Sequence, residues 1–256
     1  QSAGRYVLGI RGTRGAIDLL EDVNRIGLQG FAGDQLVSLY RYYRKLTTPA
    51  GQAVSYSDAE VATLLSSRNK VFIPASQSIL LRRSRLYGEL ALDRGIELTA
   101  GSAGPSVLPA GAPLIVTGHS LGGHLALLFG RLFPGVMEHV YTYNAPGINV
   151  FGERKLRRLG IGPIDAARLT DVASTLGTEP ISTIWSKPVI PIGVYTEPGS
   201  TLHNHSIVPL TDALALYNAF SVLSPGLSSD AASVSRMISA ATARPEESLE
   251  ITLDFL

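Results

Sequence analysis

The chain has 256 residues, of which 45% are hydrophobic, enough to form a large core in a single α/β domain over residues 1–256. Its net charge of +1 and the lack of basic runs interleaved with aromatic residues exclude nucleic acid as an expected partner. The chain has no cysteine, so the fold needs no oxidising compartment, and no apolar run is long enough for a transmembrane segment. Without a signal peptide, the N-terminus leads almost directly into a predicted strand, so we expect a processed enzyme or a domain of a longer chain.

Strand and helix patterns alternate along the chain. Short apolar runs predict strands, and apolar residues at helical spacing predict helices. In chain order we expect a strand at Tyr6–Ile10, helices at Ile17–Asn24 and Gln35–Leu46, a helix start at Ser57 with Glu60 three residues later, a strand at Ala112–Thr117 and a helix after it, strands at Val140–Tyr143, near Arg168–Thr170, near Ser182–Trp185 and near Gly193–Thr196, a helix at Ile207–Leu223 and a last strand at Ile251–Leu256. This alternation predicts an α/β fold with a mainly parallel central sheet and helices on both faces.

The stretch from Gly118 to Gly122 places one serine, Ser120, between two glycines, where the predicted strand turns into the following helix. The pentapeptide alone is weak evidence because glycine and serine are common in this chain, so the flanking strand and helix carry the prediction. A strand, a sharp turn and a helix form a nucleophile elbow, in which the serine hydroxyl is exposed and the glycines relieve crowding. We therefore expect Ser120 to be a nucleophile.

A serine hydroxyl becomes a good nucleophile when a base removes its proton and a third group holds that base. In an elbow-type enzyme the base is a histidine that follows the acid in the chain. Two histidines lie well downstream, His203 and His205, and we favour His205 because it directly precedes the point where a loop enters a helix. We expect His119 and His124, which lie too close to Ser120, to be structural.

The acid has several candidates after the elbow, namely Asp165, Asp171, Glu179 and Glu197. We favour Asp171 because the pattern puts it at the carboxyl tip of a strand, where catalytic groups gather in open α/β sheets. Asp165 ranks second, since it precedes that strand and would emerge at the opposite edge of the sheet. Glu197 would serve if the sheet were threaded differently.

The oxygen anion of a tetrahedral intermediate needs hydrogen-bond donors. We expect one to be the backbone N–H of Leu121, at the N-terminus of the helix, and the other to come from Thr13, in the turn after the first strand. The alternative is that the Gly12-Thr13 step is only a tight turn. This chemistry needs no cofactor, and we expect no metal because His203 and His205 have no further ligand cluster around them.

These motifs together resemble the class 3 (fungal-type) lipases of the α/β-hydrolase superfamily. Six segments carry the resemblance: the Arg-Gly-Thr turn at 11–13, the acidic stretch 18–22, the Gly-Phe step at 30–31, the nucleophile segment 117–123, and the strand ends at 143–147 and 171–172. The N-terminal strands of the fungal enzymes have no counterpart here. Residues 203–217 are more similar to lipase-like domains of large bacterial exoproteins, in which a His-Ser-Ile step precedes a helix, and this similarity favours His205.

The resemblance implies an α/β-hydrolase fold and a secreted lipase or esterase that cleaves lipid-like carboxylic esters through Ser120, His205 and Asp171. It also implies transient contact with a lipid interface, and a lid or acyl-binding cap at residues 47–112, for which ordinary core packing is the alternative. Other functions compatible with the motifs are a phospholipase A or acyltransferase with the same triad, and a binding module that kept the fold without turnover. The oligomeric state does not follow from the sequence.

Overall fold

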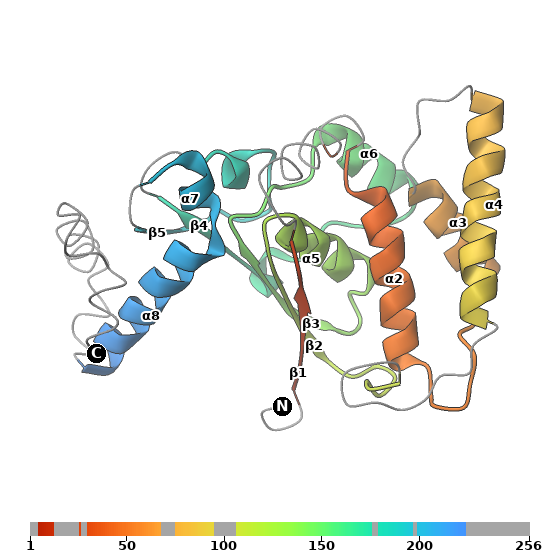
Figure 1. The fold of residues 1–256 in the computed structure, drawn as a ribbon, viewed down its shortest axis with the longest axis horizontal. Coiled ribbons are helices and arrows are strands. Elements are labelled where there is room, and N and C mark those ends of the chain that lie inside the picture. Colours follow the sequence, from red (N-terminus) through yellow and green to blue (C-terminus); the bar gives the residue numbers. More distant parts are fainter. Residues whose placement is uncertain are drawn as a thin grey trace.

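The described strands form one parallel sheet (Figure 1). The computed structural model describes residues 5–12, 26, 30–67, 75–94, 106–175, 179–196 and 199–223. The five strands lie in the order β1-β2-β3-β4-β5, and every neighbouring pair is parallel. The α/β architecture expected from the sequence is therefore present, and all five strands point their carboxyl ends to the same edge of the sheet.

Strands and helices alternate as expected, and the helices at 150–158 and 201–205 are additional to those predicted. Their bounds are β1 Tyr6–Ile10, α2 Gly33–Thr47, α3 Asp58–Ser67, α4 Ala75–Arg94, β2 Leu114–His119, α5 Leu121–Leu132, β3 Met137–Tyr143, α6 Val150–Arg158, the short 3-10 helix η1 Ala166–Arg168, β4 Leu169–Ser174, the 3-10 helix η2 Ile181–Thr183, β5 Ile192–Val194, α7 Thr201–His205 and α8 Ile207–Leu223. The predicted helix at 17–24 and the last strand at 251–256 lie outside the described residues.

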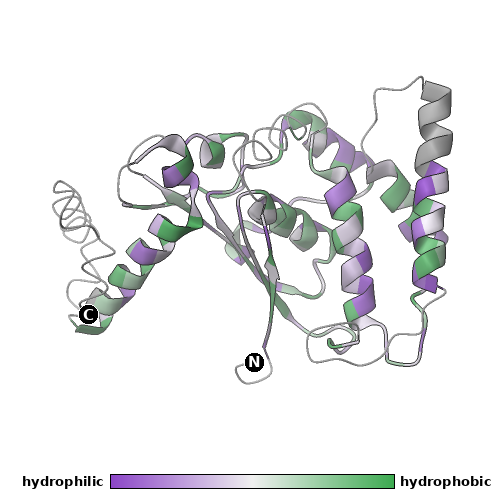
Figure 2. Cartoon of the chain, in the orientation of Figure 1, coloured by the Kyte–Doolittle hydropathy of each residue, from purple (hydrophilic) through white to green (hydrophobic). Residues whose placement is uncertain are grey.

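Side chains alternate between the two faces along each strand, and both faces carry helices. On one face Leu114, Val116 and Val140 pack with Phe129 of α5 and Tyr43 of α2, in one buried cluster. On the other face, toward the β5 edge, α8 packs against Val172 and Val194 through Leu210, Ala213 and Leu216. Figure 2 colours α2 in alternating green and purple, as expected for a helix with one face against this core.

The strand predicted near Ser182–Trp185 is wrong. Residues 181–183 form a 3-10 turn that begins after Pro180, and the Thr183 hydroxyl donates to the Pro180 carbonyl at 2.8 Å. Trp185 then has φ 63°, a left-handed conformation that ends any extended run. The apolar and β-branched composition that suggests a strand here therefore reflects a packed turn.

The described parts of segment 47–112 pack on α2. The predicted helix start is confirmed at α3, where the backbone N–H of Ser57 donates to the Glu60 carboxylate at 2.7 Å and that of Glu60 donates to the Ser57 hydroxyl at 3.3 Å. Asp93 of α4 is buried and accepts hydrogen bonds from Arg41 and Tyr56. These contacts hold α4 and the start of α3 against α2. They do not test a lid function for segment 47–112, which stays a prediction.

None of the helices within the described ranges combines the length and the apolar character needed to cross a membrane.

Candidate active site

Ser120 stands at a sharp bend between β2 and α5. Its backbone has φ 56° and ψ −127°, a region that a residue with a side chain rarely adopts and that costs roughly 1–3 kcal/mol. The bend is close-packed, because a Cβ on Gly118 would overlap the backbone of Gly122, and one on Gly122 would overlap the Ile10 carbonyl of β1. The geometry is that of the expected elbow.

The Ser120 hydroxyl meets the imidazole of His205. The Nε2 atom of His205 lies 2.8 Å from Ser120 Oγ, and both side chains are buried. Ser120 occupies the N-cap position of α5, yet its hydroxyl accepts no hydrogen bond from the helix, so it remains directed at His205. The structure therefore brings together the two residues that the sequence singles out as nucleophile and base.

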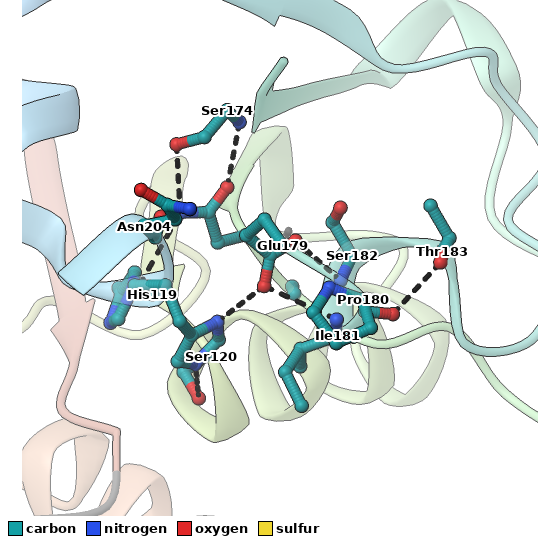
Figure 3. Close-up of polar contacts among 12 residues, drawn as sticks. His119, Ser120, Ser174, Glu179, Pro180, Ile181, Ser182, Thr183 and Asn204 are labelled. Carbon is teal, nitrogen blue, oxygen red and sulfur yellow. Dashed lines mark hydrogen bonds and ion pairs between the residues drawn. The ribbon is translucent and has the colours of Figure 1, made fainter. Parts of the chain in front are cut away.

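Glu179 forms a hydrogen bond with the other ring nitrogen of His205. Its Oε1 lies 2.6 Å from Nδ1 of His205, so the ring donates from Nδ1 and leaves Nε2 to accept the serine proton. The carboxylate also accepts the backbone N–H groups of Ile181 at 3.2 Å and Ser182 at 2.9 Å (Figure 3). Burial alone would raise the pKa of Glu179, but hydrogen bonds from His205 and Ser182 outweigh it and hold the pKa below its ordinary value. The carboxylate is therefore ionised at neutral pH.

Asp171, the acid preferred from the sequence, does not contact His205. Strand β4 continues to Ser174, so Asp171 lies three residues before the tip, and it pairs in register with Thr142 of β3. Its carboxylate accepts a hydrogen bond from Thr142 at 2.6 Å and forms a buried ion pair with Lys187 at 2.5 Å. Burial raises the pKa of Asp171, and the ammonium of Lys187 partly offsets that rise. The acid beside the histidine is Glu179, which lies in the loop after β4.

Two further candidates, Asp165 and His203, do not form the contact with His205 or Ser120 that a triad needs. Asp165 caps η1 by accepting the backbone N–H of Ala167 at 3.0 Å, ahead of β4. His203 is exposed on α7. Glu197 and Thr13 lie outside the described residues.

Leu121 and Gly12 are neighbours of Ser120 at the elbow. Leu121 is the first residue of α5, and the first N–H groups of a helix have no partner within it. Gly12 lies next to the elbow, since a Cβ placed on it would come within 3.4 Å of Ser120 Cβ. Gly12, which follows β1, therefore lies next to the elbow, while the roles of Leu121 and Thr13 as oxyanion donors stay predictions.

A cavity of about 210 Å³ lies away from this site, and none of Ser120, His205 and Glu179 lines it. Its charged lining residues already have partners, since Arg131 pairs with Glu153. Lys187, which also lines it, is paired with a carboxylate of β4. In the part of the chain that the structure describes, no group of histidine and acidic side chains has the geometry to hold a metal ion.

His124 lies inside the core below the elbow and supports it. It is fully buried, its Nδ1 donates to the Gly147 carbonyl at 3.0 Å, and its Nε2 accepts the Ala32 N–H at 3.4 Å. Burial lowers its pKa from 6.5 to about 4. The fold therefore requires this histidine to be neutral.

The free energy of unfolding is expected to fall as pH drops from about 6.5 to about 4, because over this range the unfolded chain binds a proton at His124 and the folded chain does not. The contribution of this group is about 1.4 kcal/mol per pH unit. In His124→Asn, which keeps a donor near Gly147, denaturant titrations across this range should show a slope smaller by that amount. An unchanged slope would contradict the account.

Comparison of the chain with protein families, curated proteins and solved structures finds no match. The function is therefore inferred from the residues and their geometry.

Proposed function

We propose that this protein is a serine hydrolase that cleaves carboxylic esters with Ser120 as nucleophile, His205 as base and Glu179 as the acid that orients the base. The observation that carries the proposal is the continuous relay from Ser120 Oγ to His205 Nε2 at 2.8 Å and from His205 Nδ1 to Glu179 at 2.6 Å. Each distance is within the range required for proton transfer or for holding a ring. The order serine, acid, histidine along the chain is that of an α/β-hydrolase, which is the fold we propose.

In the first half of the reaction, Ser120 Oγ attacks the ester carbonyl as His205 Nε2 takes its proton. The imidazolium that forms is stabilised by the ionised Glu179, which remains a carboxylate throughout. The proton then passes from Nε2 to the oxygen of the leaving alcohol, and the acyl group stays on Ser120. Water, deprotonated by the same nitrogen, attacks the acyl-enzyme, and the proton passes from Nε2 back to Ser120 Oγ as the bond to the acyl group breaks and the carboxylic acid leaves.

The developing oxyanion is stabilised by the N–H of Leu121, at the positive end of α5. Thr13 is the proposed second donor, since Gly12, its neighbour in sequence, borders the elbow. Because the bend at Ser120 is fixed by close packing, these donors need no rearrangement when the anion forms.

The proposed substrates have an apolar acyl chain. This rests on the family resemblance of the motifs and on exposed apolar side chains in the segments that follow β3 and β5, which lie at the same edge of the sheet as Ser120: Val150, Phe151, Leu202 and Val208. Such side chains are suited to contact an acyl chain entering from that edge.

The proposal is tested with p-nitrophenyl esters of increasing acyl length and with phospholipid. We expect turnover by the wild type, higher kcat/KM for medium and long chains than for acetate, and loss of about a thousandfold or more in Ser120→Ala. Ser84→Ala, on α4, is the matched control and should keep wild-type rates. No ester turnover by the wild type would refute the proposal, and a preference for acetate would remove only its lipid-like substrate class.

The identity of the acid is tested by comparing Glu179→Gln with Asp171→Asn. Glu179→Gln should lower kcat by roughly 10³–10⁴-fold with little change in KM, because the amide no longer selects the Nδ1–H tautomer. Asp171→Asn leaves the buried Lys187 without its counter-charge and should destabilise the fold by about 3–5 kcal/mol, with kcat of the folded protein within a few-fold of wild type.

The double variant Asp171→Asn/Lys187→Met removes both charges and allows kcat to be measured if the single variant does not fold. Loss of turnover in a folded Asp171 variant, together with retention in Glu179→Gln, would show that the acid is assigned wrongly.

A further inference from the structure

His205 lies on a small part of the fold. It is the last residue of α7, a helix of five residues, and α7 follows the edge strand β5, which has three. Elements this short hold their own position weakly, because they have few backbone hydrogen bonds. The hydrogen bond to Ser120 nevertheless requires the ring to be held to within a fraction of an ångström.

One contact on the main chain of His205 comes from His119, the last residue of β2. The Nε2 atom of His119 lies 2.6 Å from the His205 carbonyl oxygen, which can only accept, so His119 donates from Nε2. Neighbouring residues of a strand point to opposite faces, and in register His119 lies opposite Tyr143, which packs at the edge of the α8 cluster. Its ring is therefore on the face toward α7 and α8, with its centroid 5.0 Å from that of His205.

A second contact comes from Asn144, directly after β3. Its Nδ2 donates to the carbonyl oxygens of Asn204 at 3.2 Å and His205 at 3.4 Å, and its Oδ1 accepts the backbone N–H of Ser174 at 2.9 Å. Asn144 is fully buried and has φ 43°, a left-handed conformation that asparagine tolerates better than most residues. One amide thus ties the end of β4 to the end of α7.

We propose that His119 and Asn144 are positioning residues that fix the main chain of His205 and thereby set the distance from its ring to Ser120. The inference rests on the proposed function. In this proposal neither residue has a contact with the substrate. Each acts through His205, whose carbonyl they share as an acceptor and whose ring carries the proton.

The protonation state of His119 suits its position beside His205, which becomes positively charged during the proposed reaction. Burial lowers its pKa from 6.5 to about 4, although the bond to the His205 carbonyl and the nearby Glu179 favour its charged form. It is therefore neutral at pH 7, and it donates a hydrogen bond without adding a second positive charge 5.0 Å from the imidazolium.

The experiment measures kcat and KM on a p-nitrophenyl ester for the wild type, His119→Phe, His119→Gln and the control His139→Phe. Phenylalanine keeps an aromatic ring at this position but removes the N–H that donates to the His205 carbonyl. Glutamine instead places an amide N–H near the position of Nε2. His139 lies on the same sheet face and bonds Thr170 at 2.8 Å, without contact to His205.

We expect His119→Phe to lower kcat about 10–100-fold with KM within twofold of wild type, since a misplacement of 1 Å costs about that much. His119→Gln should recover to within threefold of wild type, and His139→Phe should match wild type. A merely structural role for His119 would not produce this separation of kcat from KM or the rescue by glutamine. Wild-type kcat in a folded His119→Phe would overturn the positioning proposal alone.

If His119→Phe does not fold, Asn144→Asp decides the question. Aspartate keeps the oxygen that accepts from Ser174 and tolerates the positive φ, but it cannot donate to the His205 carbonyl. We expect a loss of tenfold or more in kcat, and wild-type kcat would overturn the proposal. No turnover by the wild type would instead refute the proposed function, and this inference with it.

Discussion

The bend at Ser120 is the constraint on which the rest of the site depends. Strands β1 and β2 and helix α5 approach so closely at Gly118 and Gly122 that no side chain fits there, and this contact holds Ser120 at φ 56°. A serine in an ordinary turn would bond its own helix N-terminus. Here the strained backbone directs the hydroxyl away from α5 and toward His205, so the cost of the bend is linked to the orientation of the proposed nucleophile.

A parallel sheet explains how residues far apart in the sequence converge on that hydroxyl. The end of β2 supplies Ser120 and His119, the end of β3 supplies Asn144, and the loop after β4 supplies Glu179. These groups differ in protonation because their surroundings differ. Hydrogen-bond donors keep Glu179 ionised, and burial keeps His119 neutral. The second buried acid, Asp171, is paired with Lys187 and so does not compete for His205.

The sequence predicted the sheet, the elbow and the contact between Ser120 and His205, because each depends on a local pattern of apolar residues and glycines. It did not predict the acid. The apolar run of β4 continues past Asp171 to Ala173, and since side chains alternate, Asp171 falls on the face opposite Val172, which packs on α8. To place the acid correctly, one must know that β4 ends at Ser174 and not at Asp171. Glu179 also approaches His205 through a loop whose path, unlike a strand, has no periodicity to reveal it. The hydrogen bonds from His119 and Asn144 to the His205 carbonyl depend on tertiary contacts alone. The sequence could therefore assign His119 only a structural role.

The most direct test is to map where a fluorophosphonate attaches, since such a reagent bonds covalently to a serine whose proton has been taken by a neighbouring base. The intact protein should gain one phosphonyl group, and peptide mass spectrometry should locate it on Ser120 among all the serines of the chain. Attachment to a different serine, or no attachment under conditions that label known serine hydrolases, would contradict an activated Ser120.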